Sequence, residues 1–262
     1  MTQIIFHTRG SGPPLLLLHA FPLNAAMWDD QLPSFSELAK VWAPDLPGFG
    51  ASAAAEIAGS LDELAREIAD RLKREGVTRA AVAGCSMGGY LAFALLRVAP
   101  ALVSQLVLLN SKASADAETA RTNRLALADR VEREGCGFLE DEWHLGALSA
   151  ATLEQRPAVV KRVRALVHDA TPAGVAAAQR AMASRPDSTP LLGELRIPVL
   201  VVHGLDDRYV SEQEARAMAG AIQGAQFVGV AQAGHLPNLE RPEIVTDAVR
   251  HFLQSGVGSA ST

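Results

Sequence analysis

The stretch that decides the fold is Gly84-Cys85-Ser86-Met87-Gly88-Gly89, which follows the aliphatic run 80–83 and precedes an apolar, helix-compatible segment. A serine on a sharp strand-to-helix turn has a strained backbone, needs small residues two positions away on each side, and exposes its hydroxyl. Gly84 and Gly88 supply that room. The alternative is a turn whose serine only caps a helix, and the strand before it argues against this. Ser86 is therefore the candidate nucleophile.

Short aliphatic runs recur along the chain, with helical stretches between them. Buried runs separated by amphipathic segments indicate parallel strands joined by crossover helices. The predicted strands are 15–19, 41–43, 80–83, 106–110, 199–203 and 226–230. The predicted fold class is α/β, with a mostly parallel sheet flanked by helices.

Capping residues mark several of the helices. Ser60 and Glu63 form the sequence pattern of a capping box before a helix that Gly76 ends, and Ser211 with Glu214 repeats the pattern before 215–222. Pro242 is suited to the first turn of a last helix.

The regular alternation stops between residues 111 and 189, where the chain is rich in Ala, Arg and Glu and has no aliphatic strand run. We expect a core of 1–110 and 190–254, a helical cap (lid) of 111–189, and a flexible tail of 255–262. Such a cap would lie over the carboxyl ends of the strands, where open α/β sheets bind ligands.

Composition restricts the partners. The chain has 24 basic and 29 acidic residues, a formal charge of -5 and no Lys/Arg block, which argues against nucleic acid or membrane surfaces as partners.

Cys85 and Cys136 match no metal-ligand spacing, so we expect free thiols, no metal and no cofactor. No early segment resembles a signal or a membrane span, so the expected location is the cytoplasm. The sequence does not determine the oligomeric state.

A serine nucleophile needs a base to take its proton and an acid to orient that base. His235 lies in a loop after the last predicted strand, and Asp206 and Asp207 follow the strand 199–203. The order Ser, Asp, His is the one this arrangement uses on α/β sheets. The residues alone do not separate Asp206 from Asp207.

Other assignments of these residues are weaker. His19 and His203 end predicted strands and suit loop ordering better than proton transfer. A metal site from His203, Asp206, Asp207 and His235 has no recognised ligand spacing and leaves Ser86 unexplained. Cys85 is expected to fill space beneath the turn rather than to act as a redox switch. The four remaining histidines are predicted to be surface or packing residues: His7, His144, His168 and His251.

Acyl transfer also requires backbone N–H donors for the developing oxyanion. One donor follows the nucleophile and is Met87, and the other is expected from the loop after the strand 15–19, where Phe21 can donate and Pro22 cannot. The candidate apolar walls of the substrate pocket are Trp28, Phe49, Trp143 and Leu236, together with the Phe21 ring and Met87.

Together these segments resemble the α/β-hydrolase superfamily along nearly the whole chain. His19-Ala20-Phe21-Pro22 is similar to the family's oxyanion loop, except that Ala20 stands where glycine is usual. The segment 45–52 resembles its next loop, and 233–242 resembles its histidine segment. Gly204-Leu205-Asp206-Asp207 matches the family's Gly-x-x-Asp pattern, and this resemblance selects Asp207 as the acid.

Within the superfamily the chain resembles lidded serine carboxylesterases and 3-oxoadipate enol-lactonase-like hydrolases, which implies a hydrolase of small esters or lactones. A carbon–carbon bond hydrolase, an acyltransferase or a perhydrolase would use the same three residues. A ligand-binding or signalling protein with slow turnover is the alternative of another class.

Seven of the arginines in the cap suggest a carboxylate-binding pocket. Acidic residues are interleaved with them, which favours solvated helix faces with i,i+4 pairs. Whether any cap arginine contacts substrate is left open. The arginines are Arg121, Arg124, Arg130, Arg133, Arg156, Arg162 and Arg164.

Overall fold

A seven-stranded sheet forms the centre of the protein in a computed structural model that describes residues 3–257. The strand order is β1-β3-β2-β4-β5-β6-β7, and only the pair of β1 and β3 is antiparallel. The strands are β1 (Phe6–Arg9), β2 (Pro14–Leu18), β3 (Lys40–Pro44), β4 (Ala80–Cys85), β5 (Val103–Leu109), β6 (Val199–Gly204) and β7 (Gln226–Val230). The predicted mostly parallel sheet is confirmed.

Sequence patterns missed one strand and carried two strands one residue too far. The edge strand β1 reads Phe-His-Thr-Arg, and its last three residues are exposed, so no buried run announces it. His19 and Asn110 were predicted to end strands, but β2 and β5 each stop one residue earlier. Asn110 has a φ of 43°, which turns the chain out of the sheet.

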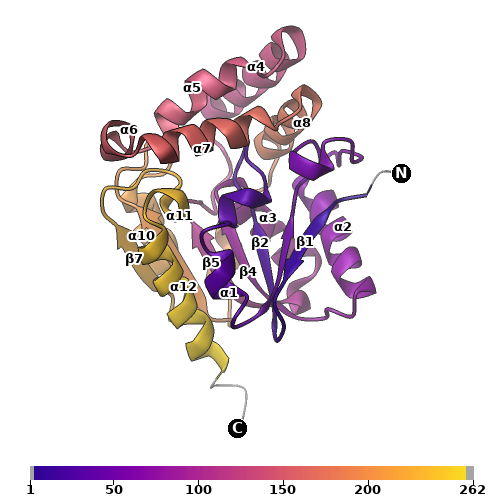
Figure 1. The fold of residues 1–262 in the computed structure, drawn as a ribbon. Coiled ribbons are helices and arrows are strands. Elements are labelled where there is room, and N and C mark those ends of the chain that lie inside the picture. Colours follow the sequence, from indigo (N-terminus) through magenta and orange to yellow (C-terminus); the bar gives the residue numbers. More distant parts are fainter. Residues whose placement is uncertain (1–2, 258–262) are drawn as a thin grey trace.

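The helices cover both faces of the sheet, with α12 on one side and α2 and α3 on the other (Figure 1). The core helices are α1 (Leu32–Phe35), α2 (Leu61–Arg74), α3 (Met87–Val98), α9 (Thr189–Leu192), α10 (Glu212–Gly220), α11 (Pro237–Glu240) and α12 (Pro242–Val257). Three short 3-10 helices occupy loops: Ala25–Trp28, Gly50–Ser52 and Pro100–Leu102.

Helix ends follow the predicted capping residues with two differences. Ser60 caps α2 by accepting from the Glu63 N–H, but the Glu63 carboxylate accepts from the Gly59 N–H, so the predicted box is incomplete. The box of Ser211 and Glu214 is present, and α10 begins beside it at Glu212 rather than at 215.

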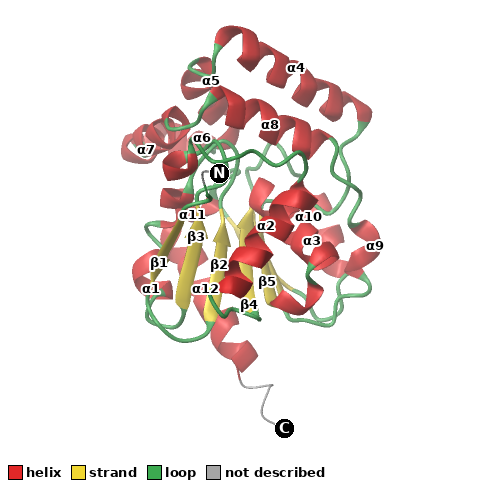
Figure 2. Ribbon diagram, turned by 90° about the vertical axis from the view of Figure 1, so that its right-hand side faces the viewer, coloured by secondary structure: helices red, strands yellow, loops and turns green. Residues whose placement is uncertain are grey.

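The remaining helices lie together beyond the carboxyl ends of the strands (Figure 2). They are α4 (Glu118–Glu134), α5 (Phe138–Ala147), α6 (Ala150–Gln155), α7 (Pro157–His168) and α8 (Pro172–Ala183), and all fall inside the predicted cap. The cap boundaries themselves stay a prediction. Helix α12 continues to Val257, past the start of the predicted tail, and residues 258–262 lie outside the described part of the chain, so the flexible tail stays a prediction.

Candidate active site

Ser86 occupies a strained turn between β4 and α3. Its φ of 52° and ψ of −112° lie where L-residues are rarely found. A Cβ at Gly84 would come within 2.3 Å of the Gly88 carbonyl oxygen, and one at Gly88 within 2.2 Å of the Leu18 carbonyl oxygen. Both positions therefore exclude any side chain, as the sequence motif predicted.

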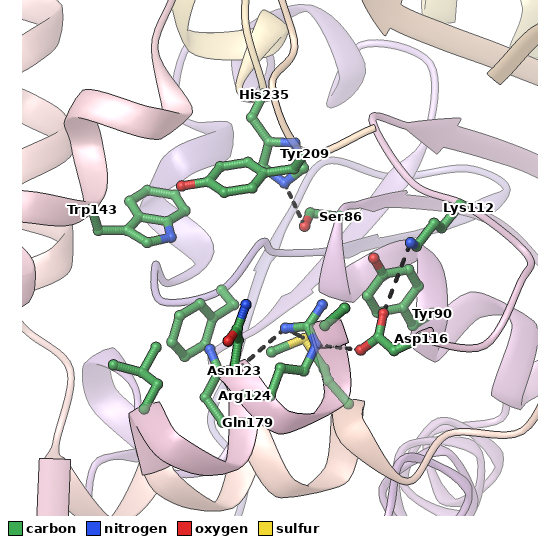
Figure 3. Close-up of a pocket in the computed structure, with 14 residues that line it drawn as sticks. Ser86, Tyr90, Lys112, Asp116, Asn123, Arg124, Trp143, Gln179, Tyr209 and His235 are labelled. Carbon is green, nitrogen blue, oxygen red and sulfur yellow. Dashed lines mark hydrogen bonds and ion pairs between the residues drawn. The ribbon is translucent and has the colours of Figure 1, made fainter. Parts of the chain in front are cut away.

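Three distant loops bring Ser86, His235 and Asp207 together. His235 Nε2 lies 2.7 Å from Ser86 Oγ (Figure 3). On the other side of the ring, His235 Nδ1 lies 2.9 Å from Asp207 Oδ2. All three side chains are nearly inaccessible to water. A low dielectric strengthens this chain of hydrogen bonds.

Asp207 is held by more than His235. Asn110 Nδ2 donates to its Oδ2 at 2.8 Å, and the Tyr209 N–H donates to its Oδ1 at 2.8 Å. Burial by itself raises the pKa of Asp207, but the charge of His235 and its hydrogen bonds outweigh burial and keep the pKa below its usual value. Asp206 is exposed, and within the described residues the carboxylate that His235 Nδ1 contacts is that of Asp207.

Sequence reasoning missed Asn110 as a site residue. Besides Asp207, its amide donates to the Gly234 carbonyl at 3.0 Å, and its Oδ1 accepts from the Gly204 N–H at 3.1 Å. Asn110 thus ties the acid to the loop of His235. The available signal was a polar residue directly after the buried run of β5, at the edge where the other site residues lie.

The two histidines set aside as bases have different roles. His19 Nδ1 donates to the Ala20 carbonyl at 3.0 Å and its Nε2 accepts from the Leu46 N–H at 2.9 Å, so its ring joins two loops. His203 is buried, and neither ring nitrogen has a partner among the described residues. No three His, Cys, Asp or Glu side chains within residues 3–257 form a group able to hold a metal.

The predicted oxyanion donors lie at the start of α3 and in the loop after β2. Within the described residues, neither the Phe21 N–H nor the Met87 N–H donates a hydrogen bond. Ala20 does not have a positive φ, so its methyl group fits this loop without backbone strain. Both donors stay predictions, and the loop leaves them available.

Cys85, next to Ser86, is fully buried. Its Sγ lies 3.8 Å from the His235 carbonyl oxygen, and burial raises the pKa of the thiol. A buried neutral thiol suits the predicted packing role.

A pocket of about 350 Å³ opens beside Ser86 beneath the cap helices. Of the predicted wall residues, Trp143 and Phe21 line it. Trp28, Phe49 and Leu236 do not: Trp28 and Leu236 are fully buried in the core, and the Phe49 ring packs edge-on against Phe21. Met87 also lies outside it, in a small apolar cavity with Phe49.

Most of the pocket wall comes from residues that the sequence did not single out. They are Tyr90, Lys112, Asp116, Ala120, Asn123, Arg124, Leu127, Gln179, Met182 and Tyr209. Several belong to α4 and α8, whose inward face only the fold reveals. The Tyr209 ring packs edge-on against His235, with ring centroids 4.9 Å apart.

The prediction of solvated arginines holds for the outer cap but is wrong for Arg124. Arg130 pairs with Glu134 and Glu142, and Arg164 pairs with Asp141, all at the surface. Of these seven arginines, Arg124 alone lines the pocket among the described residues (Figure 3).

None of the helices between residues 3 and 257 combines the length and the apolar character that crossing a bilayer requires.

Comparisons with known proteins agree with this fold. Residues 13–242 match the family described as alpha/beta hydrolase fold. The chain is 30% identical, over 93% of its length and 96% of the relative, to a pimeloyl-[acyl-carrier protein] methyl ester esterase of Nitrosomonas europaea. It is 24% identical to 3-oxoadipate enol-lactonase 2 of Acinetobacter baylyi, over 92% of this chain and 89% of that protein.

Two solved structures are also similar. A thermophilic esterase from Thermogutta terrifontis has 38% identity and a TM-score of 0.93, covering 97% of this chain and 93% of that one. The enol-lactonase from Burkholderia xenovorans LB400 has 25% identity and a TM-score of 0.88, covering 96% of each chain.

The chain therefore belongs to the α/β-hydrolase family. These relatives also confirm the prediction of a hydrolase that acts on ester bonds.

Proposed function

We propose that the chain is a serine hydrolase that cleaves a small ester or lactone through an acyl-enzyme on Ser86. The observation that carries this proposal is the continuous path from Ser86 Oγ to His235 Nε2 at 2.7 Å and from His235 Nδ1 to Asp207 at 2.9 Å. The methyl ester esterase and enol-lactonase names of the relatives support the same bond class.

In the first half-reaction, Ser86 Oγ attacks the carbonyl carbon while His235 Nε2 takes the hydroxyl proton. The N–H groups of Phe21 and Met87 receive the developing oxyanion. His235 then gives its proton to the leaving oxygen, the bond to the alcohol breaks, and an acyl ester on Ser86 remains.

In the second half-reaction, His235 Nε2 takes a proton from water as the water oxygen attacks the acyl carbon. His235 then gives this proton to Ser86 Oγ, the ester bond to the serine breaks, and the carboxylic acid leaves. Asp207 holds the imidazole with its Nδ1–H toward the carboxylate, so Nε2 is free to exchange protons with Ser86. Asn110 positions Asp207.

The experiment compares matched variants on p-nitrophenyl butyrate. Ser86→Ala is expected to lose at least about 10⁴-fold in kcat. Asp207→Asn is expected to lose about 10⁴-fold, because the amide favours the wrong imidazole tautomer. Asp206→Asn, the exposed neighbour, is the control and keeps parental activity. Labelling by a fluorophosphonate probe should require Ser86; a Ser86→Ala protein as active as its parent would end the proposal.

A further inference from the structure

The end of the pocket formed by α4 and the loop before it carries an excess of positive charge. Of the residues that line the pocket, Lys112, Asp116 and Arg124 are the ones charged at neutral pH besides the titratable His235. The Asp116 side chain is only 1% exposed, while Lys112 and Arg124 are 19% and 22% exposed. The single acid is thus hidden, and the two cations border the cavity.

Both carboxylate oxygens of Asp116 already have cationic partners. Its Oδ2 lies 2.5 Å from Arg124 Nε, and its Oδ1 lies 2.8 Å from an Nη of the buried Arg185. Lys112 Nζ lies 3.9 Å from the same Oδ1. Burial works to raise the pKa of Asp116, but its bonds and charge pairs with the two arginines outweigh burial and lower it. One carboxylate therefore faces three cations.

Arg185 belongs to the structure beneath this site rather than to the cavity. It donates to the Met182 and Ser114 carbonyls at 2.8 and 2.9 Å, and its guanidinium stacks 4.0 Å from the Tyr90 ring centroid. Lys112, Arg124 and Arg185 thus exceed Asp116 by two positive charges, and no second Asp or Glu lines the pocket among the described residues.

Lys112 and Arg124 also keep donors for a ligand. Lys112 Nζ makes no hydrogen bond to any group of residues 3–257, and Arg124 uses one Nη on Gln179 Oε1 at 3.2 Å. Arg124 projects from α4 toward the cavity, with Ser86 and His235 on the opposite side (Figure 3). Cations in a partly dry pocket favour an anion, and a guanidinium with an ammonium suits a carboxylate.

We propose that Lys112 and Arg124 form an anion subsite, so that the substrate is a short ester or lactone that also carries a carboxylate. The apolar wall of Phe21, Leu127 and Trp143 would contact the hydrocarbon that joins the two ends. The pocket volume of about 350 Å³ restricts this hydrocarbon to a short length. This inference rests on the proposed function.

The test uses two substrates of nearly equal shape, monomethyl glutarate and methyl glutaramate, whose far ends are a carboxylate and a neutral amide. The parent is expected to prefer the carboxylate by about tenfold or more in kcat/KM, the effect of one charge-assisted hydrogen bond. Lys112→Gln and Arg124→Gln should each bring the ratio of the two kcat/KM values toward one. Lys112→Gln removes no internal hydrogen bond, so it tests the subsite even where Arg124→Gln disturbs Asp116 and folding.

The matched control is Arg121→Gln, on the same helix but paired with Glu118 at the surface, which should keep the parental ratio. Equal parental kcat/KM for both substrates would overturn the subsite. So would a preference that survives both pocket variants.

Binding of glutarate to the parent and to Lys112→Gln, measured by calorimetry, separates the two proposals. Tighter binding to the parent by about tenfold supports the subsite whether or not any ester is cleaved. Turnover of p-nitrophenyl butyrate without this binding difference would leave the proposed hydrolase in place and remove the subsite.

Discussion

The sheet edge that holds His235 and the outer face of the α4 and α8 pair hold their polar side chains in different ways. At the sheet edge, Glu240 is fully buried, and its carboxyl oxygens accept from the Gly234 N–H at 2.7 Å and the Ser149 N–H at 2.8 Å. Between the cap helices, Arg180 pairs at the surface with Asp129 and Glu132.

The two regions differ in whether water can take the place of a lost partner. A buried group that loses its partner pays the full cost of desolvation, whereas an exposed ion pair exchanges its partner for water. Water therefore cannot replace the buried hydrogen bonds that hold the His235 loop. It can replace the partners in the exposed ion pairs of the outer cap. The pocket-facing side of α4 departs from its outer face, because Arg124 there pairs with the buried Asp116 of the preceding loop.

The same buried contacts also join the cap to the histidine loop. Ser149, which Glu240 binds, follows α5, and the His235 N–H donates to the Ala147 carbonyl at 2.7 Å. One short cap segment and the residue proposed as the base thus share a hydrogen-bond system. The segment 147–149 and the loop of His235 are therefore held against each other at this point.

The largest effect is expected from Glu240→Ala. It leaves two buried N–H donors without acceptors and should lower the free energy of unfolding by about 3–5 kcal/mol. Esterase kcat/KM should fall as well, because Gly234 precedes His235. Denaturant unfolding and p-nitrophenyl butyrate turnover measure the two effects. Glu243→Ala, exposed in the first turn of α12, is the control; equal stabilities for the two variants would contradict the comparison.

Sequence patterns were most informative at the sheet edge, because few residues can satisfy the contacts there. Gly84, Gly88 and Ser86 are required by backbone geometry that tolerates few residues, so local sequence predicted their arrangement. The pocket face of α4 gave no such signal, because Arg124 resembles its solvated neighbours until packing shows which way it points. Trp28 failed as a wall residue because large apolar residues suit the core equally well.

Protonation of His19, which also lies at the sheet edge, is expected to have an intermediate effect on the free energy of unfolding. Burial lowers its pKa from 6.5 to about 4, against the opposing effects of the Ala20 hydrogen bond and the charge of Asp45. Between these pH values the unfolded chain binds a proton that the folded chain does not. The free energy of unfolding should therefore fall by about 3 kcal/mol as the pH is lowered from 6.5 to 4.

His19→Gln tests this origin of acid sensitivity. Glutamine offers an acceptor for the Leu46 N–H but does not titrate in this range. Unfolding curves measured at several pH values should show a smaller pH dependence in the variant than in the parent. His7→Gln, whose partly exposed ring contacts Asp45 from the surface, is the control. If the free energies of unfolding of the parent and His19→Gln change equally with pH, His19 is not the origin of the acid sensitivity.

The smallest effect is expected on the outer cap, from Arg180→Gln. Its ion pairs with Asp129 and Glu132 lie in water, where desolvation is slight and salt screens the attraction. The midpoint of thermal unfolding should fall by less than about 2 °C, and added salt should shrink the difference from the parent. Arg180→Lys keeps the charge and should match the parent more closely still. A fall of the size expected for Glu240→Ala would mean that the outer cap is held as firmly as the sheet edge, because only a buried or networked pair loses that much.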